Sequence, residues 1–139
     1  MGGVVRTTDV EAVREAVFFS YKEIDGLDIQ GWLDDDNNIA YIDDGSVALF
    51  QRFRPGIVIG HYFFKVKGKM AIKLAKEIIS EVFKTEEAIM GMTPLVNLKA
   101  RWMNRQLGFK SNGVIDGKEG PCELVILTKK EWEANEFSA

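Results

Sequence analysis

The tripeptide Lys67-Gly68-Lys69 stands where an apolar segment of the chain gives way to an amphipathic one. The preceding segment, Ile57–Phe64, is rich in β-branched and aromatic residues and predicts a strand. After it, apolar residues recur at the spacing of one helix face over Lys69–Lys84. The free amides at a helix start bind anions, and glycine lets a phosphate approach the backbone, so this junction predicts a pyrophosphate site. The alternative is a solvated, lysine-rich helix start with a glycine turn.

His61 is the only histidine of the chain and lies on the predicted strand Ile57–Phe64. A neutral imidazole with a pKa near 6.5 can take a proton from an ammonium group, so His61 is the candidate general base. A structural histidine with satisfied hydrogen bonds is the alternative. Cys122 is the only cysteine, and no base is evident for it, so an inert buried thiol is expected. No His/Cys spacing indicates a metal site.

Five aspartates precede and interrupt the first predicted strands: Asp34, Asp35, Asp36, Asp43 and Asp44. An acidic cluster of this kind could attract a cationic amine by electrostatic steering. Two solvated turns are the alternative. Basic residues gather over Lys65–Lys76, which would suit nucleic acid, but the net charge of −3 argues against a nucleic-acid binder.

A chain of 139 residues has the length of one domain, and we expect a single domain over residues 1–139. The hydrophobic fraction of 46% is typical of a globular protein. A lone cysteine, no signal-peptide pattern and no apolar run long enough to span a bilayer together predict a cytoplasmic protein without a membrane partner.

Hydrophobic periodicity and turn residues predict the order of elements. A short strand at Val4–Arg6 precedes a helix over Asp9 to about Phe19, which Thr8-x-x-Glu11 would open as a capping box. A second short helix is expected within Tyr21–Trp32. Three antiparallel strands then follow, over Ile39–Ile42, Val47–Phe53 and Ile57–Phe64.

The second half of the chain adds a crossover unit and a closing hairpin. After the long helix come a strand at Ala88–Met92, a helix at Asn97–Leu107 that Gly108 ends, and a strand start at Phe109–Lys110. A glycine-rich turn over Ser111–Pro121, a strand at Cys122–Thr128 and a helix at Lys129–Asn135 complete the series. The expected fold is α+β in three layers, α/β/α, with a mixed, mostly antiparallel sheet of six to seven strands and helices on both faces.

The junction and the order of elements resemble the GNAT N-acetyltransferases, whose loop Arg-Gly-x-Gly-x-Gly/Ala binds the pyrophosphate of acetyl-CoA. Lys67 stands at the arginine position and Gly68 at the first glycine, while Met70 and Ile72 stand at the next two glycine positions. The resemblance, which extends from Val5 to Thr128, is also to small phage-encoded GNAT-like proteins with degenerate loops. It implies a cytoplasmic setting in a bacterial or phage-infected cell. The cofactor-binding residues it implies are Tyr62, Phe63, Phe64, Lys67, Gly68, Lys69, Met70, Ala71, Ile72 and Asn97.

A second motif carries the same resemblance, Asn97-x-x-Ala100-x-x-Met103-Asn104-x-x-Leu107-Gly108-Phe109. In the family the asparagine at the Asn97 position contacts the pantetheine arm or supports the splayed strands. Asn104 stands where the family has the tyrosine that protonates the leaving thiolate, and a carboxamide cannot serve as that acid. His61 and Asn104 are therefore the positions to which the resemblance and the residues assign catalysis.

The resemblance implies transfer of an acetyl group from acetyl-CoA to a primary amine, on a small molecule or a protein, without a metal. The alternative is a catalytically degenerate GNAT-fold structural or interaction protein, phage-encoded, and a homodimer or a protein partner fits either function. One observation discriminates between them: a parallel strand pair splayed open beside an unobstructed Gly68 loop favours the enzyme. Met70 or Ile72 filling that space excludes it.

Overall fold

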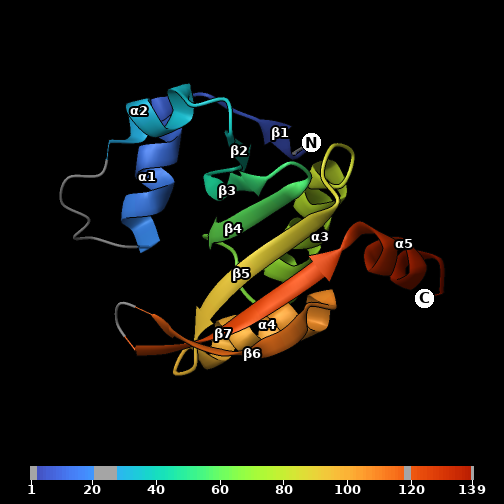
Figure 1. Ribbon diagram of the computed structural model, residues 1–139. Coiled ribbons are helices and arrows are strands. Elements are labelled where there is room, and N and C mark those ends of the chain that lie inside the picture. The colour runs from blue at the N-terminus through green and yellow to red at the C-terminus, as the bar shows by residue number, and fades with distance from the viewer. Residues whose placement is uncertain (1–2, 21–27, 118–119, 139) are drawn as a thin grey trace.

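A computed structural model of the chain describes residues 3–20, 28–117 and 120–138 (Figure 1). Its strands form one sheet in the order β1-β2-β3-β4-β5-β7-β6, in which only β4 and β5 are parallel neighbours. The strands are β1 Val5–Arg6, β2 Asn38–Asp43, β3 Ser46–Arg54, β4 Ile57–Phe63, β5 Ala88–Pro94, β6 Lys110–Gly117 and β7 Gly120–Thr128. The helices are α1 Val10–Ser20, α2 Ile29–Asp34, α3 Lys69–Val82, α4 Leu98–Leu107 and α5 Lys129–Ser138.

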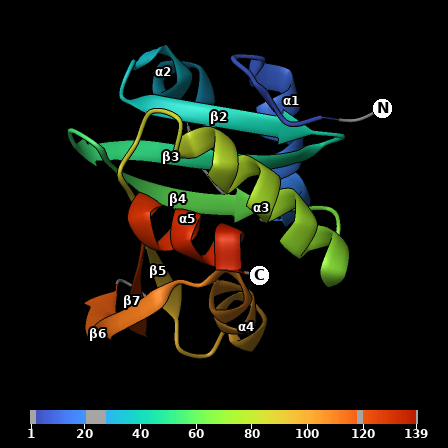
Figure 2. The ribbon, with the colours of Figure 1, turned by 90° about the vertical axis from the view of Figure 1, so that its right-hand side faces the viewer.

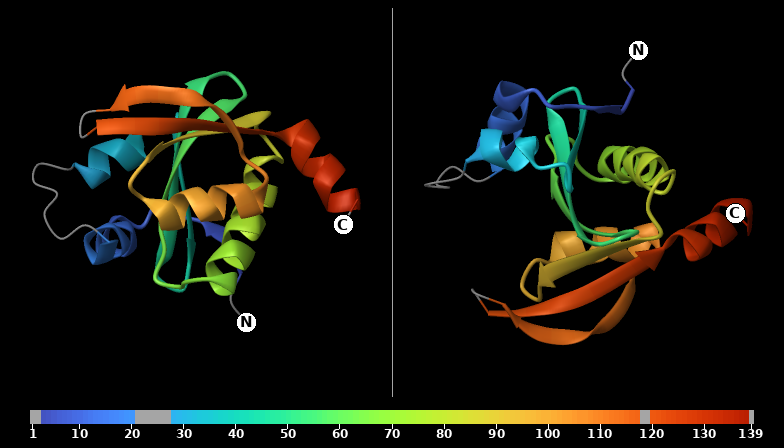
Figure 3. Two further views of the ribbon diagram at one scale, coloured as in Figure 1. Left: turned by 90° about the horizontal axis from the view of Figure 1, so that it is seen from below. Right: turned by 45° about the horizontal axis from the view of Figure 1, so that its top comes forward.

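Helices cover both faces of the sheet, so the expected three-layer α+β architecture is confirmed. Helices α1 and α2 lie on one side of β2–β4 and α3 lies on the other (Figure 3). The side chains of β2 alternate between the two faces of the sheet and so contribute to both cores. Ala40 joins the core beneath α1 and α2, while Ile39 and Tyr41 join the larger core that contains the apolar face of α3. Residues of α4 and α5 enter the same larger core through Leu107 and Trp132, and α5 lies beside α3 in Figure 2.

The long helix forms because its apolar residues share one stripe. Ala71, Leu74, Ala75, Ile78, Ile79 and Val82 are all buried, at the spacing that the sequence predicts. The helix carries the chain from the carboxyl end of β4 back to the start of β5, as a parallel strand pair requires. It therefore joins the end of one strand of the parallel pair to the start of the other.

An ion pair holds the start of β5 against β3. Arg52 on β3 donates to both carboxylate oxygens of Glu86, from Nε at 3.2 Å and from Nη2 at 2.8 Å. Burial acts to raise the pKa of Glu86, but hydrogen bonds from Arg52 and Thr85 outweigh it and hold that pKa below its usual value. The amides of the next two residues both donate to the carbonyl oxygen of Gly56, at the start of β4. The paired end of β4 and β5 is thus anchored on both sides.

Two local expectations from the sequence are wrong in detail. The segment Ser111–Pro121 is not one glycine-rich turn, because β6 runs to Gly117 and β7 begins at Gly120. Every residue of β6 is exposed, so the strand lacks the alternation that would have revealed it. The cap of α1 is not Thr8: the carboxylate of Asp9 accepts from the amides of Glu11 and Ala12 at 3.1 and 3.2 Å.

The five aspartates do not form one acidic cluster. Asp34, Asp35 and Asp36 precede β2, whereas Asp43 is its last residue and Asp44 lies at the turn into β3, so the length of β2 separates the two groups. The predicted helix within Tyr21–Trp32 is found only as α2, which begins at Ile29, and residues 21–27 lie outside the described residues. Among the described residues, no helix combines the length and apolar character needed to cross a membrane.

Candidate active site

The parallel strands β4 and β5 pair at one end and then separate. Only three residue pairs join them, the last being Ile59 with Met90, although β4 continues to Phe63 and β5 to Pro94. Figure 1 shows the two strands diverging beyond this point. We call the unpaired part of the two strands the fork. Backbone groups on the inner edges of the fork have no ladder partner, so they are open to hydrogen bonds with a ligand.

A glycine lies on each arm where the fork opens. A Cβ atom on Gly60 would meet the ring of Phe50 at 2.9 Å, so the packing of that buried ring requires glycine. A Cβ atom on Gly91 would come within 3.3 Å of the side chain of Val125. Neither of these two residues therefore places a side chain at the narrow end of the fork.

A cavity of about 930 Å³ occupies the fork and extends to the start of α3. Its size lies at the upper end of the range typical of small-molecule sites. Its cationic side chains are those of Lys67 and Lys99, and no carboxylate lies among its described lining residues. The wall is formed by Gly60–Phe64, Val66–Gly68, Ala71, Ile89–Pro94, Asn97, Lys99, Ala100, Trp102–Asn104, Phe109 and Val125.

The loop before α3 is unobstructed. Gly68 has φ +59° and ψ −132°, a conformation that favours glycine, and no atom lies within 4 Å of the position that its Cβ would take. No side chain caps the helix after it, and the first turn of α3 contains no acidic residue. The first amides of α3 therefore remain available beside Lys67, where the helix dipole favours an anion.

The structure brings most of the predicted cofactor-binding residues together on the cavity wall. Tyr62, Phe63, Phe64, Lys67, Gly68, Ala71 and Asn97 all line it. Met70 does not, since its side chain is 62% exposed. Lys69 and Ile72 line a separate shallow groove on α3, and Ile72 packs against the core. Neither Met70 nor Ile72 fills the space in front of Gly68. The arrangement that would have excluded an enzyme is therefore not found.

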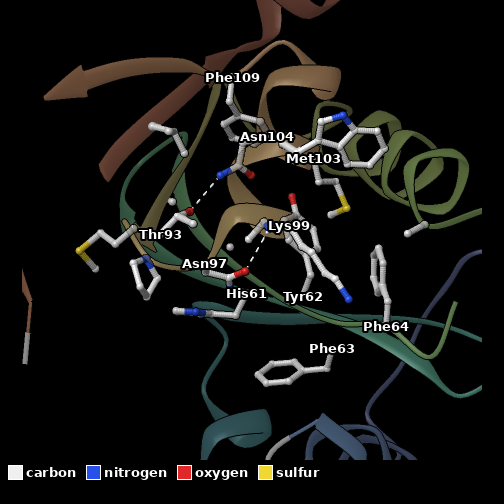
Figure 4. A pocket seen from close by; sticks show the side chains of 18 of the residues that line it. His61, Tyr62, Phe63, Phe64, Thr93, Asn97, Lys99, Met103, Asn104 and Phe109 are labelled. Carbon is white, nitrogen blue, oxygen red and sulfur yellow. Dashed lines mark hydrogen bonds between the residues drawn. The ribbon is translucent and has the colours of Figure 1, made fainter. Parts of the chain in front are cut away.

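His61 and Tyr62 present their side chains on opposite faces of β4, because consecutive strand residues alternate. Phe63, two residues after His61, packs beneath α1 and α2, so His61 belongs to that same face. Figure 4 shows the two side chains diverging from the strand. His61 is exposed, yet the protein atoms around its ring partly desolvate it and lower its pKa below 6.5. It is therefore neutral at pH 7 and able to accept a proton.

Tyr62 lies on the face of α3 and α4. Its ring packs against Phe50 and Phe64, with centroids 6.0 and 5.4 Å away. Burial raises the pKa of its phenol. The hydroxyl oxygen is buried and has no hydrogen-bond partner among the described residues. An unsatisfied buried hydroxyl at a cavity wall marks a position where a ligand atom can complete the hydrogen bonding.

Asn104, at the position of the family's tyrosine, is tied to the fork. Its side-chain amide donates to the hydroxyl oxygen of Thr93 on β5 at 2.9 Å (Figure 4). Both residues are buried and both line the cavity. The carboxamide cannot donate an acid proton, but this bond holds the open arm of β5 against α4.

Asn97 caps α4 at the mouth of the cavity. Its side-chain oxygen accepts a hydrogen bond from the amide of Ala100 at 3.1 Å, which is the usual N-cap interaction of an asparagine. The sequence drew attention to Asn97 and Asn104 but missed Thr93, Gly91 and Lys99. Thr93 had no recognisable signal, because its role depends on contact with a helix that begins several residues later.

Comparison with known proteins identifies the architecture. No family model matches the sequence, and no curated protein matches it. Aminoglycoside acetyltransferase AAC(6')-Ib, solved in complex with coenzyme A and kanamycin, superposes with a TM-score of 0.75 over 98% of this chain and 99% of its own. The chain has the fold of the GNAT acetyltransferases. At 15% sequence identity, the likeness to this enzyme concerns the fold.

Two further structures with the GNAT-type fold give the same result. RimJ from Mycobacterium smegmatis, solved with CoA-disulfide, reaches a TM-score of 0.69 at 13% identity, over 92% of this chain and 82% of its own. An uncharacterized protein from Bacillus halodurans reaches 0.73 at 15% identity, over 94% and 86%. Each of these likenesses extends over more than nine-tenths of this chain.

Proposed function

We propose that this protein transfers an acetyl group from acetyl-CoA to a primary amine. The observation that carries the proposal is the unobstructed Gly68 loop at one end of a cavity that occupies the fork. This arrangement offers an anion site and, next to it, two strand edges with unpaired backbone groups. Acetyl-CoA has matching parts in the same order, a pyrophosphate followed by an arm with two amide groups.

The pyrophosphate would bind at Lys67, Gly68 and the first amides of α3. Lys67 supplies charge, Gly68 lets the phosphate approach the backbone, and the uncapped helix start supplies N–H donors. The absence of carboxylates from the described cavity lining favours an anionic ligand there. Lys69 and Met70 would contribute their backbone amides, whereas the amide of Ile72 already donates to the carbonyl oxygen of Gly68.

The arm of the cofactor would lie along the inner edge of β4 and pass through the fork toward Gly60. Its amides would pair with the backbone as an added strand does. The wall at Asn97, Asn104 and Thr93 would support it from the side of α4. The thioester would then lie between the two faces of the sheet, where an amine could reach it from the side of His61.

The reaction needs a neutral amine held against the thioester carbonyl. Positioning of the two reactants supplies much of the rate. His61, neutral at pH 7, would accept the proton that the nitrogen loses as the C–N bond forms. AAC(6')-Ib was solved with kanamycin, an amine-bearing small molecule, so we propose a small-molecule amine as the acceptor.

Binding of acetyl-CoA is the first test. A ligand at 100 times its Kd stabilises the native state by about 2.7 kcal/mol, which raises the Tm of a chain of this length by roughly 9 °C. Substitution Lys67→Ala should reduce the shift, while Lys130→Ala, an exposed lysine on α5, should not. No shift with millimolar acetyl-CoA in the wild-type protein would refute the proposal.

One observation favours a second candidate, a cofactor-binding protein without transferase activity. Asn104 replaces the acid residue of the family and is engaged with Thr93. Release of free thiol from acetyl-CoA, measured across a panel of amines, distinguishes the two candidates. Binding without thiol release on any amine supports the non-catalytic protein.

A further inference from the structure

The hydroxyl of Tyr62 is a polar atom whose surroundings leave it without a partner. It is buried, it belongs to a residue of the cavity wall, and no described residue accepts or donates a hydrogen bond to it. Leaving a buried hydroxyl unpaired is costly, and a hydrophobic contact alone would be better served by phenylalanine. Phe64, two residues further along the same face, shows that phenylalanine occurs on this wall. The oxygen therefore points to a hydrogen bond made with a ligand.

The position of Tyr62 indicates which part of a ligand it meets. The residue lies on the unpaired arm of β4, between the Gly68 loop and the narrow end of the fork. Its ring points toward α4, with the hydroxyl on the side of Met103 and Asn104 (Figure 4). A cofactor with its pyrophosphate at Gly68 and its arm along β4 would bring its thioester end past this hydroxyl.

We propose that the Tyr62 hydroxyl donates a hydrogen bond to the thioester sulfur and stabilises the thiolate as the C–S bond breaks. The inference rests on the proposed acetyl transfer. Asn104 is engaged with Thr93 through one of its two amide hydrogens, and a carboxamide, unlike a phenol, has no acidic proton to share with a thiolate. Tyr62 reaches the cavity from β4 instead of α4, so it is not recognisable from the helix motif.

The step balances without a further reactant. The amine nitrogen forms a bond to the carbonyl carbon and loses a proton to His61 or water. The C–S bond then breaks, and its electron pair goes to sulfur. Tyr62 keeps its proton and holds the thiolate by a charge-assisted hydrogen bond, and the thiolate takes a proton from water when CoA leaves.

The test uses binding of CoA, so it does not need the acceptor. Free CoA has a thiol that ionises at alkaline pH, whereas acetyl-CoA has none. We would measure the Kd values of both ligands at pH 7 and pH 9.5 for the wild type, Tyr62→Phe and Tyr41→Phe. Tyr41 is the matched control, because it lies on the same face and contacts Phe50 but does not line the cavity.

We expect Tyr62→Phe to bind CoA about as well as the wild type at pH 7 and about tenfold more weakly at pH 9.5, where the thiolate must enter the cavity without its donor. Acetyl-CoA binding should change less than about threefold at either pH, and Tyr41→Phe should follow the wild type. Acetyl-CoA and CoA differ only at the thiol, so the comparison of the two ligands removes the effect of pH on the rest of the site.

Equal Kd values for wild type and Tyr62→Phe at both pH values would overturn the role of Tyr62 and leave the proposed function intact. An equal loss for CoA and acetyl-CoA at pH 7 would also overturn it, since that indicates a packing role. Failure of Tyr62→Phe to fold would show that the hydroxyl is structural. Failure of the wild type to bind either ligand would refute the proposed function itself, and this inference with it.

Discussion

Removing Arg52 should destabilise the protein more than removing its partner Glu86. The Glu86 side chain is only 2% exposed, so Arg52→Ala leaves a carboxylate buried without its cation. Breaking a buried pair in this way costs about 3–5 kcal/mol. The Arg52 side chain is 29% exposed, so after Glu86→Ala the guanidinium can reach water, and we expect a loss of only about 1–3 kcal/mol.

The difference in stability between the two variants is large enough to be measured by thermal unfolding. With an unfolding entropy of about 2.1 cal/mol/K per residue, a loss of 3–5 kcal/mol lowers the Tm by roughly 10–17 °C. Arg54→Ala is the matched control, because Arg54 lies on the same strand. Among the described residues, its guanidinium interacts only with the ring of Phe53, 5.5 Å from the ring centroid. Its loss should cost less than about 1 kcal/mol.

The pH dependence provides a second signature. The folded pKa of Glu86 lies below 4.5, so its contribution is fully present above that pH and is lost as pH falls through the folded pKa. In Arg52→Ala the carboxyl can protonate and so escape the cost of an unpaired charge. Because burial raises the pKa of the unpaired carboxyl, the stability gap between the wild type and this variant should shrink as pH falls through that raised pKa toward the lowered pKa of the wild type. A gap that is constant from pH 7 to pH 3.5, or a larger loss from Glu86→Ala, would refute the reasoning.

Three further perturbations address the site. His61→Gln should reduce kcat and abolish the acidic limb of the pH–rate profile. In the wild type this limb should rise through a pKa below 6.5, because the folded protein lowers the pKa of His61. A wild-type limb centred above pH 7 would contradict the assignment. Asn104→Ala and Thr93→Val should each cost about 1–3 kcal/mol in urea unfolding, and the double variant should cost clearly less than their sum, because both remove the same 2.9 Å bond. Additive losses would show that the bond is unimportant. Gly60→Ala should destabilise the protein by about 1–3 kcal/mol, because the added Cβ meets the Phe50 ring at 2.9 Å. Adding Phe50→Leu should recover part of the lost stability. No recovery would refute the steric cause.

The fold was largely predictable because its elements carry strong local patterns. The stripe from Ala71 to Val82 and the glycine at position 108 after α4 needed no tertiary information. Strand β6 had no such pattern, since an edge strand exposed along its whole length buries no residue. Gly113, with φ +104°, lies where the register of β6 shifts, and in the sequence it resembled a turn residue.

The site was only partly predictable. The Gly68 junction was recognisable because the strand, loop and helix are adjacent in sequence. The fork was not, since it depends on how far β4 and β5 remain paired, and no local residue pattern encodes that length. Thr93 and Tyr62 acquire their roles through Asn104 and through the cavity, which only the folded chain brings together. The five aspartates show the reverse case, because proximity in sequence suggested a cluster that β2 separates.

The two ends of the sheet affect how the protein behaves at high concentration. At one end β1 offers only the two residues Val5 and Arg6, and at the other β6 is interrupted by the irregularity between Ser111 and Val114. Short or bulged edge strands are poor templates for the addition of another chain. Deleting Gly113 would straighten an edge that exposes Val114 and Ile115, and the shortened protein should then aggregate under conditions in which the natural sequence stays dispersed.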